Sequence, residues 1–349
     1  MFFNPTHLSL NILSRYHRYR APTSTVGRMS YVLEINNLRT YFFTLRGVVR
    51  AVDGVSLKLR KGETLGIVGE SGCGKSTLAW SMMKLVPPPG RIVSGSIKID
   101  GIDITRMSES EVRRKIRWRK ISMIFQGAMN ALNPVYRVGD QIIEPLIIHG
   151  KMEKEKALSI AANLVKAVGL PEEILERYPH ELSGGQKQRI VIAMAMAMEP
   201  DIIIADEPTT ALDVVVQAQI LNLMKKLHRE RGISFILITH DLGVVTELSE
   251  RIAVMYAGKI VEYASADDIF EKPLHPYTQA LIRAVPRLKG DIHRLEYIPG
   301  TPPDLRRPPP GCRFYPRCPR RFEPCDKEEP PLQEVEKDHW VACWLHIRR

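Results

Sequence analysis

A glycine-rich stretch at residues 69–77 constrains the fold of this chain more than any other feature. It reads Gly69-Glu70-Ser71-Gly72-Cys73-Gly74-Lys75-Ser76-Thr77 and fits the pattern Gly, four residues, Gly-Lys-Ser. An apolar run, 65–68, precedes it and a helix-forming stretch, 78–84, follows it. Because free backbone N–H groups and the positive end of a helix dipole then point into the loop, the stretch predicts a phosphate cradle rather than an ordinary glycine turn.

The side chains within this loop predict how a nucleotide is held. Lys75 can reach the β- and γ-phosphates, and the Ser76 hydroxyl can hold Mg²⁺. Cys73 is interpreted as an incidental small residue. The residues expected to contact the nucleotide here are Gly69, Ser71, Gly72, Cys73, Gly74, Lys75, Ser76 and Thr77.

The charge balance of the chain is basic. Its 349 residues carry a formal charge of +11, with arginines gathered in the first thirty residues and again after residue 305. This balance suits nucleic acid or an anionic membrane surface, and solvated surface charge is the alternative.

No apolar run approaches the roughly 18 residues of a spanning helix. We therefore expect a cytoplasmic protein without disulfides. Residues 1–30 are expected to form a disordered basic arm, with an over-long gene prediction that places the true start at Met29 as the alternative.

The order of apolar strands and helices predicts an α/β fold. Residues 31–68 read as strands, and residues 127–182 read as a helical insertion. After that insertion, helices are predicted at 185–198, 214–230 and 242–248, and strands at 202–205, 234–239 and 252–256. Apolar strands that alternate with helices form parallel sheets covered on both faces, with ligands at the carboxyl ends of the strands. From residue 286 onward, no regular structure is predicted.

An acidic pair, Asp206-Glu207, ends one of the buried strands. At that edge of the sheet Asp206 can bind the Mg²⁺ shell, and Glu207 can orient and deprotonate a water that attacks the γ-phosphate. The alternative is that the pair only caps a helix.

The segment Leu182-Ser183-Gly184-Gly185-Gln186 predicts a second helix N-terminus suited to phosphate. Ser183 is a good N-cap, and the two glycines let a ligand approach the backbone closely. One γ-phosphate does not need two such cradles from the same subunit, so this second cradle needs another explanation.

Taken together, these motifs resemble the ATP-binding subunit of an ATP-binding-cassette (ABC) transporter over residues 31–265. That family has a P-loop NTPase core, an antiparallel β subdomain and an α-helical subdomain, and its members hydrolyse ATP. The motifs that carry the resemblance, in the family's order, are 69–77, Gln126, 182–186, Asp206-Glu207, Ala211-Leu212-Asp213 and His240. In such proteins two subunits pair head to tail, which explains the second cradle.

The resemblance also implies roles for individual residues. The catalytic residues would be Glu207, His240, Gln126 and Lys75, with Ser76, Gln126 and Asp206 around Mg²⁺ and His240 on the γ-phosphate. The contacts made to a partner's ATP would come from Ser183, Gly184, Gly185, Gln186 and Asp213. One departure from many relatives is Gly127-Ala128 after Gln126, where those relatives have Asp-Pro, and it leaves the stiffness of that loop open.

The aromatic cluster Tyr41-Phe42-Phe43 has two interpretations. From the residues alone, core packing is favoured over stacking on a purine, because aromatic side chains are mostly buried for their area. The resemblance reverses this preference and implies that Phe42 stacks on adenine, with Tyr41 as the competing choice.

The tail, 266–349, resembles the carboxyl-terminal extension of the oligopeptide, dipeptide and nickel importers. The resemblance rests on the stretches 274–281 and 299–303. Four cysteines, Cys312, Cys318, Cys325 and Cys343, follow with gaps of five, six and seventeen residues. They suggest a metal site that pins a poorly cored loop. All-cysteine ligation favours an iron–sulfur cluster, which the resemblance implies is a [4Fe-4S] cluster, with zinc or free thiols as alternatives.

The function that the resemblance implies is an ATPase that powers import of peptides, with nickel or a sugar oligomer as alternative solutes. Its partners would be a second, non-identical ATPase subunit, two transmembrane permeases and an extracellular solute-binding protein. The chain would then be peripheral on the cytoplasmic face of the membrane. Rival interpretations are a cassette ATPase acting on nucleic acid and a regulatory subunit with an inactive site.

Overall fold

The structure is a computed structural model, and it describes residues 30–127, 130–284 and 298–347. Residues 1–29, for which a disordered arm was predicted, lie outside the described part, as does Ala128 of the unusual Gly127-Ala128 pair. Contacts divide the chain into 1–30 and 31–349, and the second unit is described below by itself.

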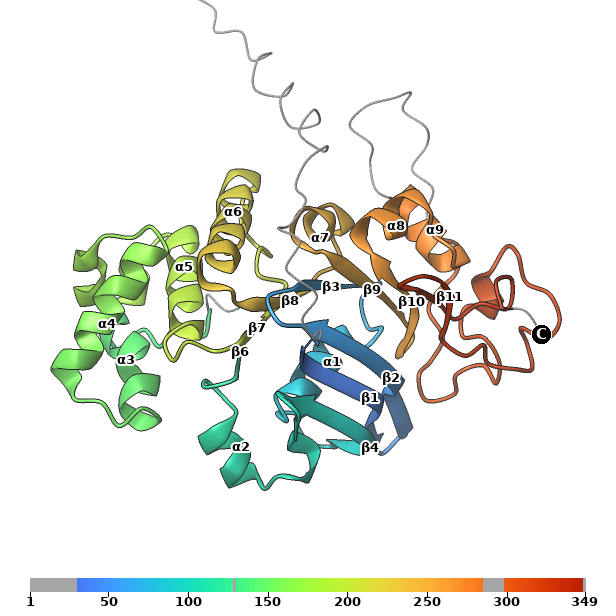
Figure 1. The fold of residues 1–349 in the computed structure, drawn as a ribbon, viewed down its shortest axis with the longest axis horizontal. Coiled ribbons are helices and arrows are strands. Elements are labelled where there is room, and N and C mark those ends of the chain that lie inside the picture. The colour runs from blue at the N-terminus through green and yellow to red at the C-terminus, as the bar shows by residue number, and fades with distance from the viewer. Residues whose placement is uncertain (1–29, 128–129, 285–297, 348–349) are drawn as a thin grey trace, which may run out of the picture. The chain divides into compact units, whose positions relative to one another are not determined.

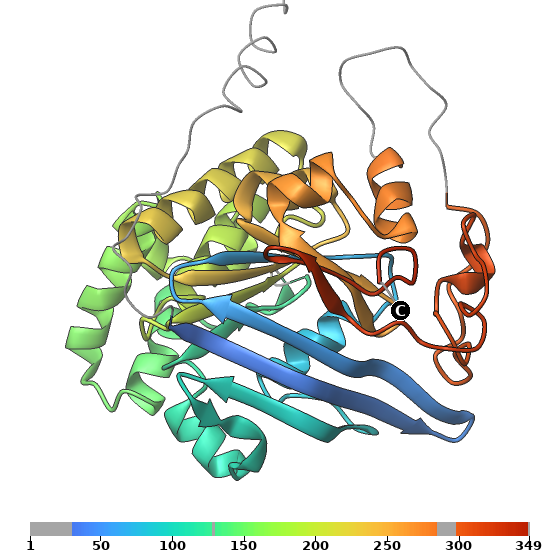
Figure 2. The ribbon, with the colours of Figure 1, turned by 45° about the vertical axis from the view of Figure 1, so that its right-hand side comes forward.

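A four-stranded antiparallel sheet opens this unit, with strand order β2-β1-β4-β5. Alternate residues of β2, such as Val55, Leu57 and Leu59, are buried, while Lys58 faces outward, as expected for a strand with one covered face. Figure 2 shows the long β1–β2 ribbon in front, with β4 beside it. The strands of this sheet are β1 (Tyr31–Thr44), β2 (Gly47–Arg60), β4 (Gly90–Ile99) and β5 (Ile102–Asp103).

The larger sheet has eight strands in the order β11-β12-β10-β9-β3-β8-β7-β6. The strands from β9 to β6 pair in parallel, as predicted, whereas β10, β12 and β11 pair antiparallel at one edge. Its strands are β3 (Thr64–Val68), β6 (Ile121–Ile124), β7 (Ile202–Asp206), β8 (Ser234–Ile238), β9 (Arg251–Tyr256), β10 (Lys259–Ser265), β11 (Gln333–Glu336) and β12 (His339–Val341).

The last two strands correct the expectation that the tail lacks regular structure. β12 pairs with β10 through Tyr263 and Trp340, and β11 pairs with β12. Both strands are short, and β11 is mostly exposed, so neither carries the apolar run by which a strand is recognised.

Helices and the small sheet cover the two faces of the large sheet, as predicted. Along β7, Ile202 and Ile204 pack into a core with α1 and the antiparallel sheet, whereas Ile203 and Ala205 pack into a core with the other helices. Figure 1 shows α3, α4 and α5 gathered in a helical group beyond the β6 edge. The helices are α1 (Lys75–Met82), α2 (Glu109–Lys115), α3 (Val138–Ile148), α4 (Lys154–Ala167), α5 (Gly184–Ala195), α6 (Val214–Arg231), α7 (Leu242–Leu248), α8 (Ala266–Glu271) and α9 (Pro276–Arg283).

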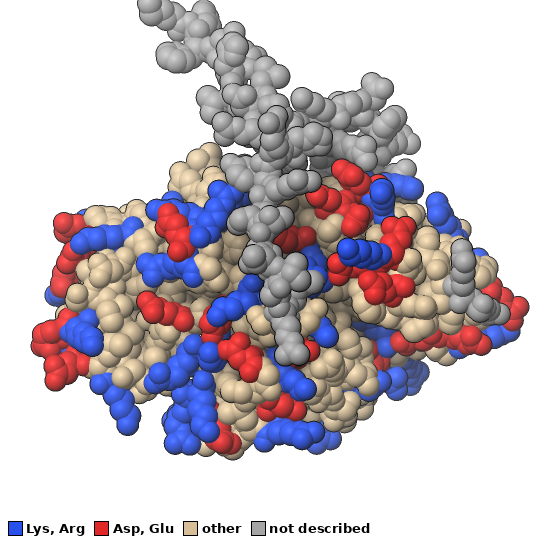
Figure 3. Space-filling view, in the orientation of Figure 1, with Lys and Arg blue, Asp and Glu red and all other residues tan. Residues whose placement is uncertain are grey.

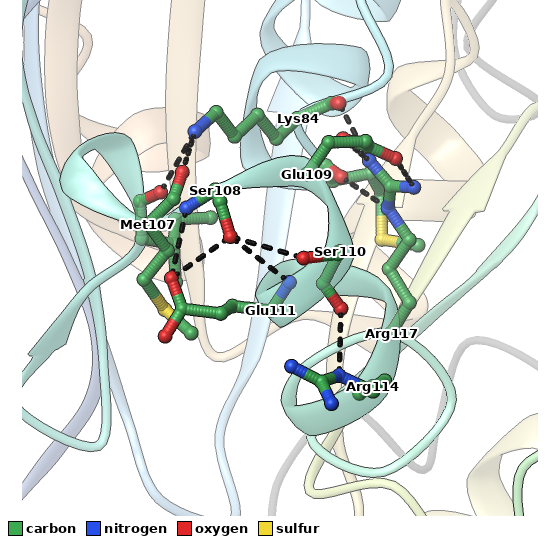
Figure 4. Close-up of polar contacts among 10 residues, drawn as sticks. Lys84, Met107, Ser108, Glu109, Ser110, Glu111, Arg114 and Arg117 are labelled. Atoms are coloured by element: carbon green, nitrogen blue, oxygen red, sulfur yellow. Dashed lines mark hydrogen bonds and ion pairs between the residues drawn. The ribbon is translucent and has the colours of Figure 1, made fainter.

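A polar network fixes the carboxyl end of α1. The Arg117 guanidinium donates to the carbonyls of Met83, at 2.9 Å, and Lys84, at 2.7 Å, and pairs with Glu109 at the start of α2 (Figure 4). A capping box between Ser108 and Glu111 begins α2. Because helix ends leave carbonyls unpaired, this network holds α1 in place from the end opposite the glycine-rich loop.

The surface of the described residues carries charges of both signs. On the face shown in Figure 3, Lys and Arg are interspersed with Asp and Glu. Among the residues that the structure describes, no helix is both long and apolar enough to cross a membrane.

Candidate nucleotide site

The predicted cradle has the expected strand, loop and helix context. β3 ends at Val68, and α1 begins at Lys75. Gly74 has φ of 108°, and a Cβ there would lie 2.0 Å from the Ala51 carbonyl oxygen; at Gly69 it would lie 2.0 Å from that of Met255. The loop therefore follows a path that only glycine allows at these two positions.

Lys75 is buried at the centre of the loop. Its ammonium group donates to the carbonyls of Gly69, at 2.7 Å, and Glu70, at 3.1 Å, and it lies 3.8 Å from the Cys73 sulfur. Burial raises the pKa of the Cys73 thiol, so this side chain stays neutral beside the loop.

Asp206 ends β7 beside the phosphate loop and has the environment that a divalent cation requires. Its side chain is buried, and its Oδ1 atom has no hydrogen-bond partner. Burial raises the pKa of this carboxyl, against the hydrogen bond from Ser76. A buried carboxylate oxygen without a partner, beside a seryl hydroxyl, fits Mg²⁺, which prefers oxygen ligands.

Three side chains make hydrogen bonds to the Glu207 carboxylate, and the sequence analysis had named two of them, Gln126 and His240. Gln126 Nε2 donates to Glu207 Oε2 at 2.8 Å, and His240 Nδ1 lies 3.1 Å from Glu207 Oε1. Thr210, which sequence reasoning missed, donates to Oε2 at 3.0 Å. Burial raises the pKa of Glu207, but the hydrogen bonds from His240 and Thr210 outweigh it and lower the pKa overall. The carboxylate is thus ionised at neutral pH.

The second cradle begins α5 and is accessible. The Ser183 side chain accepts from the Gln186 amide, while the Gln186 side chain accepts from the Ser183 amide, so the two form a capping box. Ser183 and Gly184 are exposed, whereas Gly185 and Gln186 are half-buried. Asp213 caps α6 by accepting from the Val216 amide at 2.9 Å. A Cβ at Gly185 would lie 2.8 Å from Val216 Cγ1, so the starts of α5 and α6 are neighbours.

The structure separates the two candidate base-stacking residues. The Tyr41 hydroxyl donates to Asp53 Oδ1 at 2.6 Å. Burial, and next this hydrogen bond, raise the pKa of Tyr41 to about 12. The Phe42 ring lies against Gly90, and both rings are half-buried. The Tyr41 hydroxyl is therefore engaged by Asp53, whereas Phe42 is held by packing alone.

The four tail cysteines line one small pocket, together with His275 and Phe314. None of the four forms a disulfide. Burial raises the pKa of Cys312 to about 11 and that of Cys343 to about 12. Within the described ranges, no three His, Cys, Asp or Glu side chains are grouped so as to hold a metal ion, so the four thiols share a pocket without forming a preformed metal site.

These features define a P-loop ATPase with an acidic residue poised beside the phosphate loop, and comparison with known families specifies the class. The ABC transporter family model matches residues 52–210, and the model described as oligopeptide/dipeptide transporter, C-terminal region, matches residues 261–325.

Curated relatives match nearly the whole chain. The dipeptide transport ATP-binding protein DppD of Bacillus subtilis is 52% identical over 324 residues, which cover 92% of this chain and 96% of DppD. The oligopeptide transport ATP-binding protein OppD of Salmonella typhimurium is 47% identical over 318 residues, which cover 90% of this chain and 94% of OppD.

Solved structures of ABC cassettes share the fold. The dimeric bacterial cassette MJ0796 is 32% identical with a TM-score of 0.60, covering 67% of this chain and 98% of that cassette. The cbiO1 subunit from Clostridium perfringens is 28% identical with a TM-score of 0.61, covering 70% of this chain and 92% of that subunit.

The chain belongs to the family of ABC transporter ATP-binding subunits, in the group that carries the oligopeptide/dipeptide transporter carboxyl-terminal region. The resemblance, the α/β fold and the ATPase class predicted from the sequence are confirmed. ATP is the nucleotide that this family binds, with Mg²⁺ as its cation.

Proposed function

We propose that this chain binds and hydrolyses MgATP to power the import of peptides through separate permease subunits. The observation that carries the proposal is the complete Gln126–Glu207–His240 group in a chain that matches dipeptide and oligopeptide transport subunits over about nine-tenths of its length. An inactive regulatory subunit would not need to retain an ionised carboxylate with three hydrogen-bond donors at this position.

In the proposed mechanism Glu207 accepts a proton from the water that attacks the γ-phosphate. Gln126, Thr210 and His240 orient its carboxylate, and His240 also contacts the γ-phosphate. Lys75 leaves its carbonyl partners for the phosphates. Ser76, Gln126 and Asp206 would hold Mg²⁺, which neutralises the charge on the β- and γ-phosphates.

The proposed active assembly is a head-to-tail pair of ATPase subunits. The exposed Ser183 and Gly184, with Gly185, Gln186 and Asp213 beside them, then complete the ATP site of a related but non-identical partner. In this arrangement residues 31–265 form the ATPase domain, with a helical subdomain at 127–182. Residues 266–349 form the extension.

The permeases are proposed to dock on the helical subdomain, at the cytoplasmic face of the membrane. Val135 is 71% exposed and Tyr136 is 56% exposed, and both lie on the segment that leads from Gln126 to α3. Exposed apolar side chains that lie together mark interaction surfaces. An extracellular solute-binding protein would deliver the peptide.

The test is co-expression with candidate peptide permease subunits from the same organism, followed by purification and reconstitution in vesicles. We expect the full-length chain to co-purify with two permeases and to support ATP-dependent peptide uptake when the binding protein is present. Uptake of nickel or of a sugar oligomer instead of peptides would reassign the solute. Tight binding of DNA or RNA without any permease would overturn the proposal in favour of a nucleic-acid ATPase.

We also propose that Cys312, Cys318, Cys325 and Cys343 hold a [4Fe-4S] cluster. The support is that all four thiols line one pocket and that thiolates are the ligands of such clusters. Anaerobically purified protein should show a broad visible absorption band and about four iron atoms per chain. A colourless protein would overturn this assignment, in favour of zinc if it contains zinc and of free thiols if it is metal-free.

A further inference from the structure

The carboxyl-terminal extension makes direct contact with the phosphate loop through a buried arginine. Arg317 forms a two-pronged ion pair with Glu70, the second residue of the loop, with N–O distances of 2.7 and 3.0 Å. The Arg317 side chain is 4% exposed and that of Glu70 is 26% exposed. Paired, planar contacts of this kind fix orientation as well as charge.

The same extension holds the backbone of the loop. The Glu70 amide donates to the hydroxyl of Tyr277, on α9, at 2.9 Å. Arg317 is itself held by the carbonyls of Ile298 and Pro299, at 3.2 and 2.8 Å. Glu70 is therefore fixed at both its backbone and its carboxylate by groups about two hundred residues further along the chain.

A second arginine from the same turn is linked to β1, the strand that carries Tyr41 and Phe42, through Asp53 of the neighbouring strand β2. Arg313 is buried, and its guanidinium contacts Asp53 Oδ2 and the Ala257 carbonyl. Asp53 Oδ1 accepts from the Tyr41 hydroxyl at 2.6 Å. Because Tyr41 precedes Phe42 on β1, Arg313 braces the strand from which Phe42 would meet the base.

Both arginines belong to a segment that a buried aromatic residue anchors. They flank Phe314, which is 1% exposed and packs against the rings of Tyr256 and Tyr277 at centroid distances of 5.3 and 5.4 Å. An aromatic cluster of this kind anchors a segment of irregular structure. The turn thus presents two fixed cations to two parts of the nucleotide site.

We propose that Arg313 and Arg317 are positioning residues for ATP: Arg317 holds the phosphate loop through Glu70, and Arg313 holds the base-side strand through Asp53 and Tyr41. Arg317 also neutralises a carboxylate that would otherwise repel the incoming phosphates. The inference rests on ATP binding at residues 69–77, and it gives the extension a role in that site.

The first arm of the test measures the dissociation constant of MgATP for the purified full-length chain. Arg317→Gln should weaken binding about tenfold, because it leaves the Glu70 charge unpaired beside the phosphates. Glu70→Gln combined with Arg317→Gln should recover most of this loss. The matched control is Arg307→Gln, at an exposed arginine of the same extension, and it should leave binding unchanged.

The second arm separates the two arginines by using inorganic tripolyphosphate, which lacks a base, as a competing ligand. Arg317→Gln should weaken ATP and tripolyphosphate alike. Arg313→Gln should weaken ATP by about tenfold and tripolyphosphate much less, since Arg313 acts on the base side. Equal weakening of both ligands by Arg313→Gln would overturn its base-side role.

The outcomes distinguish this inference from the nucleotide site itself. Wild-type protein that fails to bind MgATP would overturn the site. Wild-type binding with unchanged affinities in Arg317→Gln and Arg313→Gln would overturn only the positioning role. So would an Arg317→Gln defect that is just as large when Glu70 is also replaced, because it would not depend on the ion pair.

Discussion

At the scale of single residues, the balance of forces on Glu207 decides what the site can do. Burial favours the protonated acid, whereas the hydrogen bonds from His240 and Thr210 favour the carboxylate, and the pKa of Glu207 is lowered overall. Glu207 also has a φ of 49°, a conformation that non-glycine residues adopt only where surrounding structure holds them. Its amide donates to the Ile238 carbonyl at 2.8 Å, which ties this strained residue to β8.

Replacing this carboxylate tests the general base directly. Glu207→Gln should lower the rate of ATP hydrolysis by about 100-fold or more and leave MgATP binding within about threefold of wild type. Single-turnover hydrolysis and equilibrium binding measure the two effects. The milder Thr210→Ala removes one donor and should lower the rate by about fivefold. Undiminished hydrolysis by Glu207→Gln would contradict the role given to this residue.

His228 gives a prediction about stability and pH. Its hydrogen bond to Glu250, with Nε2 at 3.4 Å from Oε1, raises its pKa above the ordinary 6.5, against the effect of burial. The folded state then favours the protonated ring. The stabilisation is full below pH 6.5 and is lost as the pH rises through the folded-state pKa.

The measurement is the difference in melting temperature between wild type and His228→Gln. This difference should be larger at pH 6 than at pH 8, and small in free energy, below about 1 kcal/mol, because Glu250 is half exposed. A difference that grows toward pH 8 would contradict the direction of the pKa shift.

At the scale of elements, α1 links the phosphate loop to the small sheet. It is only eight residues long, and Arg117 holds the chain directly beyond its carboxyl end. Short helices are marginal by themselves and depend on packing and capping. The position of the cradle therefore depends on a contact more than thirty residues away in the sequence.

Removing that contact should destabilise the protein. Arg117→Ala leaves two carbonyls and Glu109 without their donor and should lower the free energy of unfolding by about 1–3 kcal/mol. Arg114→Ala, at an exposed arginine whose contact is one 3.3 Å bond to the Ser110 carbonyl, should change it by less than about 0.5 kcal/mol. Urea unfolding followed by circular dichroism compares the two, and equal effects would refute the capping role.

Prediction from the sequence succeeded where the signal is local. The strand, loop and helix around Lys75 and the run from β7 to β9 follow from apolar patterning and glycine placement over a few residues. The sequence analysis missed β11 and β12, and among the described residues their partner strands are each other and β10. The same limit hid Arg317, since its partner Glu70 is 247 positions away and no periodicity connects them.

At the scale of the whole molecule, the segment between β6 and α3 joins the proposed reaction centre to an exposed surface. Gln126 begins it in contact with Glu207, and Val135 and Tyr136 lie near its end, before the helical group. A change at Glu207 when ATP is bound or hydrolysed therefore has a short covalent route to the proposed permease-docking surface. Coupling of this kind requires the two sites to share a movable element.

Val135→Asp tests that route in the complete transporter. A charge at this 71% exposed position should leave the isolated subunit as stable as wild type, within about 0.5 kcal/mol, and should not affect MgATP binding. It should abolish co-purification with the permeases, and with it peptide uptake, because an unpaired charge buried at an interface is strongly disfavoured. Leu45→Asp, at a fully exposed leucine on the β1–β2 turn, is the matched control and should leave assembly intact. If Val135→Asp assembles normally but Leu45→Asp does not, the permeases dock on the antiparallel sheet instead, and Gln126 has no direct path to them.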